Sequence, residues 1–276
     1  MRTDVIGWSI LLAAAAAFGA FIVGQLHWGE ALRPAAYAYP ATGPECPATT
    51  AAAPPPDDSG LPGYTVRTPS NYDPRRAHPL LMVFSPAGSN RALTERFTGL
   101  THDATAQGLI VAYVDSLRLS RDAVARFARV VSAIERQWCI DPRRISFTGH
   151  SDGGSVSELI ALLDTGIDVA PAAVVASAGG LIDTDFAEFE CRRPIDVTLY
   201  HGRDDRHFPG YGASAARGWA QCLGCDASPD TDTEGCAVYR NCRGALKYCE
   251  QPGGHWRWPD INSAIVAKAA AAVATD

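Results

Sequence analysis

The sequence has 276 residues, 47% of them hydrophobic and 20% charged, and a formal net charge of −6. This composition is typical of a globular protein, and the length allows one domain of roughly 200 residues together with additional segments. The 24 Lys and Arg residues are scattered along the chain. That distribution argues against a nucleic-acid-binding protein, which needs a basic surface for its affinity.

The N-terminal segment, residues 1–28, contains an apolar run without a charged residue at positions 5–24. A helix of that length spans about 30 Å, the thickness of the hydrocarbon core of a bilayer. We therefore expect either a secretory signal peptide or an uncleaved signal anchor. Apolar regions of signal peptides are usually shorter, which favours the anchor, and Ala36-Tyr37-Ala38 resembles a cleavage site but lies far beyond the run. Both alternatives place the rest of the chain outside the cytoplasm, secreted, periplasmic or held at a membrane by residues 5–24.

Residues 29–62 are rich in Pro and Ala and are predicted to form a linker. Proline lacks an amide donor and disfavours helix, so this linker should be extended and semi-rigid. If the anchor is uncleaved, the linker would hold a globular domain away from the membrane. That domain is predicted to occupy residues 63–276.

Within this domain, short apolar runs typical of buried strands alternate with segments of helical periodicity. Strands are predicted at 64–67, 79–84, 109–113, from about 144 to the glycine at 149, and at 172–176, 195–200 and 246–249. Helices are predicted at 92–107, 121–138, about 156–163, 214–222 and 261–272. Such alternation predicts an α/β fold with a mainly parallel sheet and helices on both faces.

The pentapeptide Gly149-His150-Ser151-Asp152-Gly153 fits the G-x-S-x-G nucleophile elbow. In that motif a serine lies on a strained turn between a buried strand and a helix, with its hydroxyl exposed. The glycines on either side of Ser151 leave room for the close crossing of strand and helix. The predicted strand and helix flank the motif as required, so Ser151 is the candidate nucleophile.

A serine hydroxyl needs a base within hydrogen-bonding distance, and the base needs a third group that orients it. In sheets of this kind, active groups lie in loops at the carboxyl ends of strands. Two adjacent aspartates, Asp204 and Asp205, follow one late strand of the domain, and His255 follows the last one. The order Ser, Asp, His is that of the α/β-hydrolase fold.

Eight cysteines are many for a cytosolic enzyme, and five of them fall in one short region near the C-terminus. This usage predicts disulfides and an exported protein. Cys222-Leu223-Gly224-Cys225 alternatively fits half of a zinc site. A second C-x-x-C at zinc-ribbon spacing is missing, so no metal is expected.

The placement of the cysteines suggests one pairing, Cys139 with Cys191, because each stands just before a predicted strand. Cys46 lies in the linker and either pairs with the domain or stays free. Bridges in the region 224–248 would fix the histidine loop. The cysteines expected to form disulfides are Cys139, Cys191, Cys222, Cys225, Cys236, Cys242 and Cys249.

Several motifs occur together in the domain, between about residues 64 and 259. They are Pro79-Leu80, Asp141-Pro142-Arg143-Arg144, Gly149-His150-Ser151-Asp152-Gly153-Gly154, His201-Gly202-Arg203-Asp204-Asp205, and Gly253-Gly254-His255 followed by Trp258-Pro259. This set resembles the poly(3-hydroxybutyrate) depolymerase and feruloyl/acetylxylan esterase group of α/β-hydrolases. The resemblance implies ester hydrolysis through an acyl-enzyme, without a metal or organic cofactor. It also makes Asp205 the acid of a Ser151-Asp205-His255 triad, with Asp204 as the alternative.

The chain departs from that family at the loop Ser85-Pro86-Ala87-Gly88-Ser89-Asn90, where the family usually has His-Gly. Pro86 has no backbone N–H and cannot donate a hydrogen bond. The expected oxyanion donors are therefore the amides of Ala87 and Asp152.

Phe208, Trp256 and Trp258 are candidate residues of the substrate pocket, since aromatic side chains offer rigid apolar area, although core packing explains them equally well. The ester itself stays open: a polyhydroxyalkanoate, a feruloylated or acetylated polysaccharide, or a short-chain ester. Two alternative functions remain. One is a lipase or peptidase of the same fold, and the other is a non-catalytic, surface-anchored binding protein on a hydrolase fold.

Overall fold

The computed structural model describes residues 26–40, 45–46, 60–166, 169, 171–189, 191, 193–271 and 273. The apolar run predicted to be a signal peptide or anchor, residues 5–24, lies outside the described residues. None of the described helices combines the length and the apolar character needed to cross a membrane.

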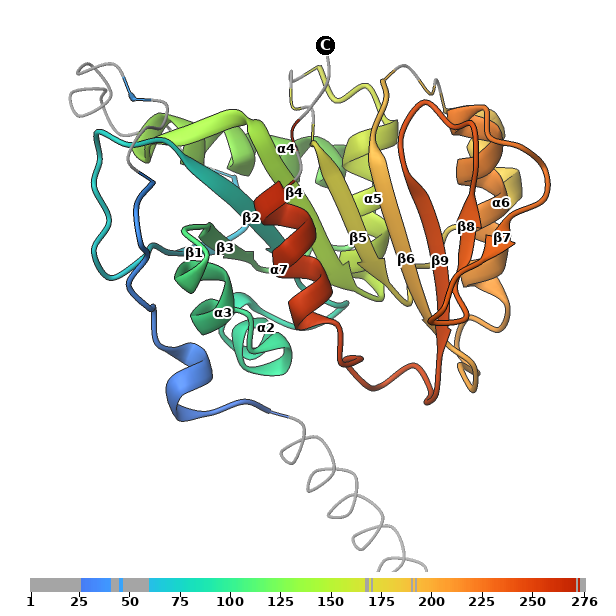
Figure 1. Ribbon diagram of the computed structural model, residues 1–276, viewed down its shortest axis with the longest axis horizontal. Coiled ribbons are helices and arrows are strands. Elements are labelled where there is room, and N and C mark those ends of the chain that lie inside the picture. The colour runs from blue at the N-terminus through green and yellow to red at the C-terminus, as the bar shows by residue number, and fades with distance from the viewer. Residues whose placement is uncertain are drawn as a thin grey trace, which may run out of the picture.

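The centre of the described structure is a nine-stranded sheet in the order β1-β3-β2-β4-β5-β6-β9-β8-β7. The six strands from β3 to β9 in this order run parallel (Figure 1). At one edge β1 pairs antiparallel with β3, and at the other β8 pairs antiparallel with β9 and β7 with β8. The strands are β1 (Tyr64–Arg67), β2 (His78–Phe84), β3 (Ile110–Val114), β4 (Ile140–His150), β5 (Ala173–Ser177), β6 (Asp196–Gly202), β7 (Asp230–Thr231), β8 (Ala237–Tyr239) and β9 (Leu246–Gln251).

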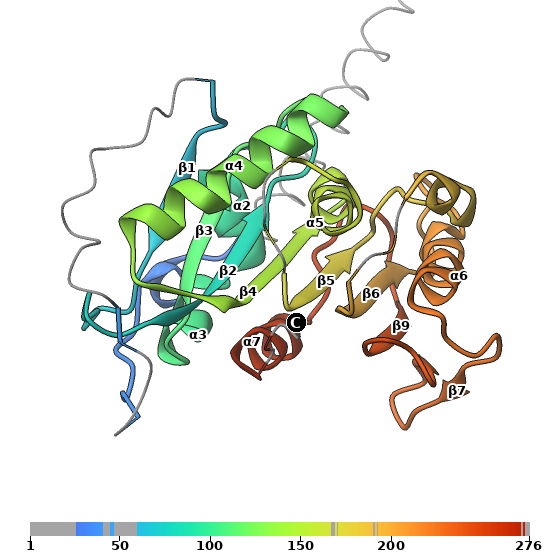
Figure 2. The same ribbon diagram turned by 90° about the horizontal axis from the view of Figure 1, so that it is seen from above.

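Helices cover both faces of the sheet, as the alternation of strands and helices predicts. Seen from above, α4 and α5 lie on one side of the sheet and α3 and α7 on the other (Figure 2). The helices are α2 (Arg91–Thr98), α3 (Thr101–Ala106), α4 (Arg121–Gln137), α5 (Asp152–Leu162), α6 (Tyr211–Leu223) and α7 (Asn262–Ala271), with short 3₁₀ turns η1 (Gly29–Leu32) and η3 (Asp183–Glu188).

Strand β2 shows why these segments form a buried sheet. All seven of its residues are buried. Leu80, Met82 and Phe84 join the core under α4, α5 and α6, while Leu81 and Val83 join the core under α3 and α7. A strand with apolar residues on both faces is stable only between two layers of helix, so β2 lies in the interior of the sheet.

The predicted helix at 92–107 is wrong in one respect, because the structure has two helices there. Gly99 ends α2 with φ +64° and ψ 23°, a left-handed conformation that terminates a helix. Helix α3 begins two residues later, at Thr101. The apolar periodicity continues across this break and therefore hides it.

The strands β7 and β8 were not predicted from the sequence. They extend the sheet beyond β9 in antiparallel fashion, through pairs such as Val238 with Lys247. Their residues are exposed or half-buried. Short strands of that kind lack the apolar pattern on which strand prediction depends.

The four disulfides of the described residues are Cys46–Cys139, Cys191–Cys222, Cys225–Cys242 and Cys236–Cys249. The predicted pairing of Cys139 with Cys191 is therefore wrong, and all seven cysteines expected in disulfides are bonded. The two cysteines precede β4 and β6, and β5 lies between these strands. Two strand spacings amount to about 10 Å, whereas the Cα atoms of a disulfide lie within about 7 Å.

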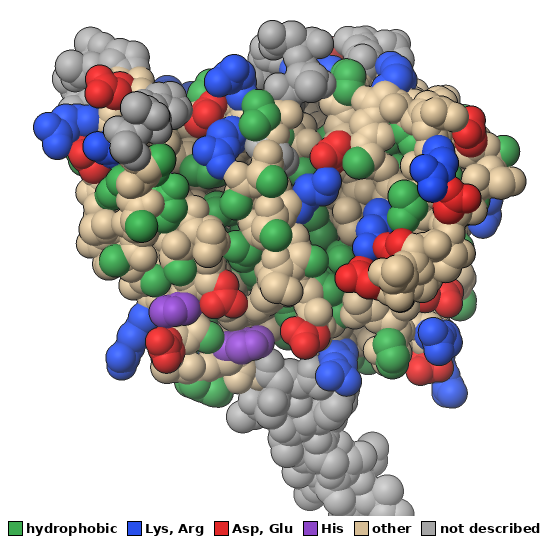
Figure 3. Space-filling view, in the orientation of Figure 1, with side chains coloured by type: hydrophobic (Ala, Val, Ile, Leu, Met, Phe, Trp, Pro, Cys, Tyr) green, Lys and Arg blue, Asp and Glu red, His purple; other side chains and the backbone are tan. Residues whose placement is uncertain are grey.

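The described part of the predicted linker packs against the domain. The amide of Ala35 donates to the hydroxyl of Thr105 at 2.8 Å, and Cys46 is bonded to Cys139. Residues 26–40 are thus held at the surface by hydrogen bonds. Figure 3 shows the face covered by α7, where Lys and Arg side chains are interspersed with Asp and Glu side chains and do not gather into a basic surface.

Candidate active site

The G-x-S-x-G motif lies at the junction of β4 and α5, as predicted. Ser151 adopts φ 57° and ψ −123°, a conformation that non-glycine residues rarely adopt. A β-carbon at Gly153 would collide with the carbonyl oxygen of Phe84, and one at Gly149 with the backbone of Gly153. Only glycine permits this approach of β2, β4 and α5, so the backbone itself places Ser151 at the carboxyl edge of the sheet.

Ser151, His255 and Asp205 form one continuous line of hydrogen bonds. Ser151 Oγ lies 2.8 Å from His255 Nε2, and His255 Nδ1 lies 2.8 Å from Asp205 Oδ2. The three residues come from the loops after β4, β9 and β6, and all three are buried. The neighbouring Asp204 is exposed, so the structure places Asp205 and not Asp204 beside His255.

The carboxylate of Asp205 is held by several donors at once. Its Oδ1 accepts hydrogen bonds from the amides of His207 and Phe208, each at 2.8 Å. Burial alone would raise the pKa of Asp205, but the bonds from Phe208, His255 and His207 outweigh it and lower the pKa below its usual value. Asp205 is therefore a carboxylate at neutral pH, oriented to accept from His255 Nδ1.

His201 is a second histidine at this carboxylate, and sequence reasoning gave it no role. Its Nε2 lies 2.8 Å from the carbonyl oxygen of Phe208 and 3.4 Å from Asp205 Oδ2. Burial lowers the pKa of His201, so its imidazole is neutral and donates to the carbonyl. The spacing of four residues between His201 and Asp205 was the available signal for this contact.

The loop after β2 carries Ala87, whose amide was predicted to form the oxyanion hole together with the amide of Asp152 at the elbow. Residues Pro86 to Ser89 form a turn in which the Ser89 amide donates to the Pro86 carbonyl at 3.0 Å and Gly88 has φ +70°. Among the described residues, neither the Ala87 amide nor the Asp152 amide has a hydrogen-bond partner. Because Phe84 touches Gly153, the loop that follows Phe84 begins against the elbow.

Two of the three aromatic residues proposed for the pocket lie beside His255. The ring of Phe208 is perpendicular to that of His255 at 5.0 Å, and the ring of Trp256 lies 5.3 Å from it. Trp256 is 62% exposed, so its face is open to a ligand. Trp258 differs: it is a buried core residue whose Nε1 donates to Asn262.

Potential metal ligands gather at one place in the described residues, Asp232, Glu234 and Cys236. Cys236 is bonded to Cys249, and Lys247 forms an ion pair of 2.7 Å with each carboxylate. This group is therefore a salt-bridged, disulfide-linked loop in which the sulfur of Cys236 is not a thiolate.

The fold is that of the α/β-hydrolases, as solved structures confirm. An acetyl xylan esterase from Aspergillus awamori superposes with a TM-score of 0.57 at 15% sequence identity, over 70% of this chain and 88% of that one. An esterase from Thermogutta terrifontis with butyrate bound superposes with a TM-score of 0.51 at 14% identity, over 75% and 85% of the two chains. At such low identity these structures establish the fold alone.

A curated relative comes closer in sequence. Feruloyl esterase B of Piromyces equi is 26% identical to this chain over an alignment of 226 residues, which covers 68% of this chain and 41% of the relative. The chain thus spans less than half the length of that protein. No protein-family model matches the sequence. The chain is similar to feruloyl and acetylxylan esterases, as its motifs predict.

Proposed function

We propose that the chain is an exported serine esterase that hydrolyses carboxylic esters through the triad Ser151, His255 and Asp205. The observation that carries this proposal is the line of two 2.8 Å hydrogen bonds that joins the three side chains at a strained elbow. Ion pairs are common in proteins, but a nucleophile, a base and an orienting acid in this order and geometry define acyl-transfer chemistry.

The first half of the reaction forms an acyl-enzyme. His255 Nε2 takes the proton of Ser151 as Oγ attacks the ester carbonyl carbon, and a tetrahedral intermediate forms. The bond to the alcohol oxygen then breaks, and His255 returns the proton to that oxygen so that the alcohol leaves. In the second half, His255 takes a proton from water, the hydroxide attacks the acyl carbon, and the acid is released with Ser151 regenerated.

Asp205 and two amides supply the electrostatic part of the mechanism. The carboxylate of Asp205 holds His255 with Nε2 toward Ser151 and favours the imidazolium that forms during attack. The amides of Ala87 and Asp152, which have no other partner among the described residues, donate to the oxyanion. Removing one such donor typically costs about 2.7–4 kcal/mol of transition-state stabilisation.

Export is supported by the four disulfides of the described residues, because disulfides persist in oxidising compartments. A signal peptide or anchor at residues 1–28 would provide the route out of the cytoplasm. The boundaries predicted for the linker and the domain, 29–62 and 63–276, remain part of this proposal.

The substrate class that we favour is a polysaccharide ester carrying acetyl or feruloyl groups. The names of the relative and of one structural neighbour point to such esters. The exposed ring of Trp256 beside His255 offers a flat apolar face of the kind that stacks on sugars or aromatic acids. Polyhydroxyalkanoates and short-chain esters are the alternatives.

The decisive test is hydrolysis of p-nitrophenyl acetate and p-nitrophenyl butyrate by the full chain and by Ser151→Ala. We expect hydrolysis by the wild type and a loss of at least about 10³-fold in kcat for Ser151→Ala, since the nucleophile is removed. Circular dichroism would establish that both proteins are folded. Equal inactivity of the two folded proteins would contradict the proposal and favour a binding protein on a hydrolase fold. If the wild type is active, assays with acetylated xylan and methyl ferulate would distinguish between the substrate classes.

A further inference from the structure

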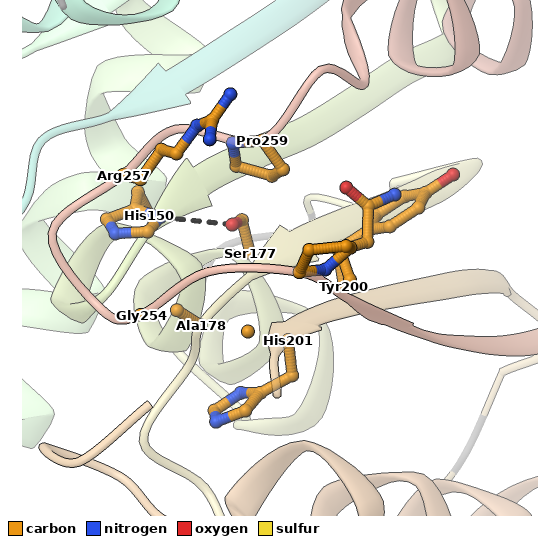
Figure 4. Close-up of a pocket in the computed structure, with 11 residues that line it drawn as sticks. His150, Ser177, Ala178, Tyr200, His201, Gly254, Arg257 and Pro259 are labelled. Carbon is orange, nitrogen blue, oxygen red and sulfur yellow. Dashed lines mark hydrogen bonds between the residues drawn. The ribbon is translucent and has the colours of Figure 1, made fainter. Parts of the chain in front are cut away.

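His150, a buried histidine beside His201 and His255, forms a hydrogen bond with the main chain of the catalytic histidine. His150 directly precedes Ser151 and is 5% exposed. Its Nε2 lies 2.6 Å from the carbonyl oxygen of His255, and its Nδ1 lies 3.0 Å from Ser177 Oγ. A carbonyl oxygen can only accept, so Nε2 carries the proton, and Nδ1 accepts from the Ser177 hydroxyl. Figure 4 shows His150 and Ser177 joined in this way.

The imidazole of His150 keeps this arrangement at neutral pH. Burial lowers the pKa of His150 to about 4. The aromatic rings of Phe97 and Trp258 lie at 5.4 and 6.1 Å from it. The ring is therefore neutral, and a neutral ring has one donor and one acceptor. The Ser177 hydroxyl donates to the acceptor, Nδ1, so the N–H at Nε2 is available to donate to the His255 carbonyl.

Ser177 connects the nucleophile to the same network. Its carbonyl oxygen accepts the Ser151 amide at 2.9 Å, while its hydroxyl bonds to His150. The last residue of β5 thus holds Ser151 directly and His255 through one imidazole. The separation between the nucleophile and the base follows from this chain of three bonds.

A small cavity of about 20 Å³ borders the histidine loop, lined among others by His150, Ser177, His201 and Gly254 (Figure 4). Side-chain packing against the loop is therefore incomplete there. The bond from His150 to the His255 carbonyl ties the main chain of the loop to β4 beside this cavity.

We propose that His150 is a positioning residue that holds the main chain of His255 at hydrogen-bonding distance from Ser151. This inference rests on the proposed function, since the distance matters for Ser151 only if His255 acts as its base. His150 itself does not touch substrate. A displacement of about 1 Å in a catalytic group can cost on the order of 10²-fold in rate.

Two amide variants separate the two bonds of His150. In His150→Gln the side-chain amide reaches the place of Nε2 and can donate to the His255 carbonyl. In His150→Asn the shorter amide reaches only the place of Nδ1, so the bond to Ser177 can persist while the bond to His255 is lost. His78 is the matched control, because it is also buried and bonded to a main-chain carbonyl, that of Gly108 at 2.7 Å, but lies at the start of β2.

The experiment measures kcat and KM with p-nitrophenyl acetate, normalised to active sites titrated by the initial burst of p-nitrophenol. We expect His150→Asn to lower the per-site kcat on the order of 10²-fold with little change in KM, and His150→Gln to stay within about fivefold of the wild type. His78 bonds the Gly108 carbonyl through Nδ1, so Gln, whose amide reaches the place of Nε2, is the variant that loses this bond. His78→Gln should lower the melting temperature without changing the per-site kcat. A purely structural role of His150 would instead lower the number of active sites in both variants and leave the per-site kcat unchanged, which would overturn the proposal.

A second readout does not require catalysis. The proton on His255 Nδ1, shared with Asp205, gives a low-field resonance in proton NMR that depends on the alignment of the two groups. We expect this resonance to shift or broaden in His150→Asn and to persist in His150→Gln. If the resonance is unchanged in His150→Asn, the positioning role is wrong. If it responds as expected while the wild type hydrolyses no ester, the proposed function fails and the positioning role stands.

Discussion

The two walls of the active site are held in place by different forces. On the nucleophile side, the elbow is fixed by the contact of backbones: Gly149 and Gly153 let β2, β4 and α5 meet without intervening side chains. On the side of the acid and the base, three disulfides cross-link the part of the chain that runs from the end of η3 into β9. The short strands β7 and β8 in this part have no buried face.

This contrast shows how one site combines a rigid nucleophile with a base carried on a less densely packed region. The nucleophile side derives its stability from the buried core, whose apolar strands would be stable in any compartment. The other side begins from the buried strand β6 and adds covalent links, which persist only in oxidising surroundings. The two sides meet at Ser151 and His255, and through the bonds of His150.

The largest expected effect comes from the acid on the cross-linked side. Asp205→Asn should lower kcat on the order of 10³–10⁴-fold, because an amide cannot accept from His255 Nδ1 and stabilise its charge in the same orientation. The exposed Asp204 is the matched control, and Asp204→Asn should change kcat less than about threefold. Steady-state kinetics with p-nitrophenyl butyrate measures both. The reverse order would move the acid to Asp204.

On the nucleophile side, the sharpest test is a single methyl group at the elbow. Gly153→Ala places a β-carbon against the Phe84 carbonyl, and overpacking of this kind costs about 1–3 kcal/mol or more in unfolding free energy. Gly224→Ala is the control, since Gly224 also has a special conformation, φ +69°, but has open space around its Cα. We expect Gly224→Ala to cost about 1 kcal/mol with activity retained. Equal losses of unfolding free energy for the two variants in urea would show that the close contact of backbones does not require glycine at position 153.

Removing disulfides should separate stability from turnover. Replacing Cys46 and Cys139 by Ser opens a loop of 93 residues and should cost about 4–5 kcal/mol, without changing the per-site kcat. Replacing Cys236 and Cys249 opens a loop of 13 residues and should cost only about 3 kcal/mol. The second pair should nevertheless lower kcat, because Cys249 lies in β9, which leads to His255. If instead the first pair alone lowers turnover, the contrast between the two walls is wrong.

Acid should destabilise the fold through its buried histidines. Burial lowers the pKa of His150 to about 4 and also lowers those of His78 and His201. These groups take up protons more readily in the unfolded chain, whose histidines titrate near pH 6.5, so stability is lost as pH falls from about 6.5 towards 4. For His150 the loss is on the order of 3 kcal/mol. Urea unfolding of Glu158→Gln between pH 4 and 7 measures this loss without the opposite contribution that Glu158 makes in the same range. A flat profile of that variant would contradict the burial of the histidine rings.

Glu158 on the helix behind Ser151 has the opposite dependence. Burial raises its pKa to about 7, against the hydrogen bond of 2.7 Å that Trp219 Nε1 donates to it. The folded protein therefore binds a proton that the unfolded chain releases above about pH 4.5, and stability should fall as pH rises from there to about 7. Glu158→Gln should remove this slope. Parallel profiles of variant and wild type would show that Glu158 is ionised throughout.

The sequence predicted the sheet, its helices and the three triad candidates because their signals are local. Apolar runs mark β2 and β3, and the elbow is a contiguous motif. The break at Gly99 was missed, since apolar periodicity continues across it. The pairing of cysteines was also missed, because the position of β5 between β4 and β6 is a property of the sheet order and not of the nearby sequence.

The contact of His150 with His255 was beyond sequence reasoning for a similar reason. His150 is adjacent to Ser151 in the chain, which directs attention to its own strand. Its partner is the carbonyl of a residue 105 positions away. Trp258 shows the converse: it stands three positions after His255 in the sequence, yet its ring belongs to the core.

The central claim is that Ser151 is the nucleophile of an esterase, and covalent labelling tests it most directly. Diethyl 4-nitrophenyl phosphate reacts with an activated serine, releases 4-nitrophenol and leaves a stable diethylphosphoryl group. We predict that mass spectrometry of the full chain finds one such group, located on the peptide that contains Ser151, and that Ser151→Ala stays unlabelled. Labelling at another serine in both proteins, with ester hydrolysis unaffected by Ser151→Ala, would contradict the account.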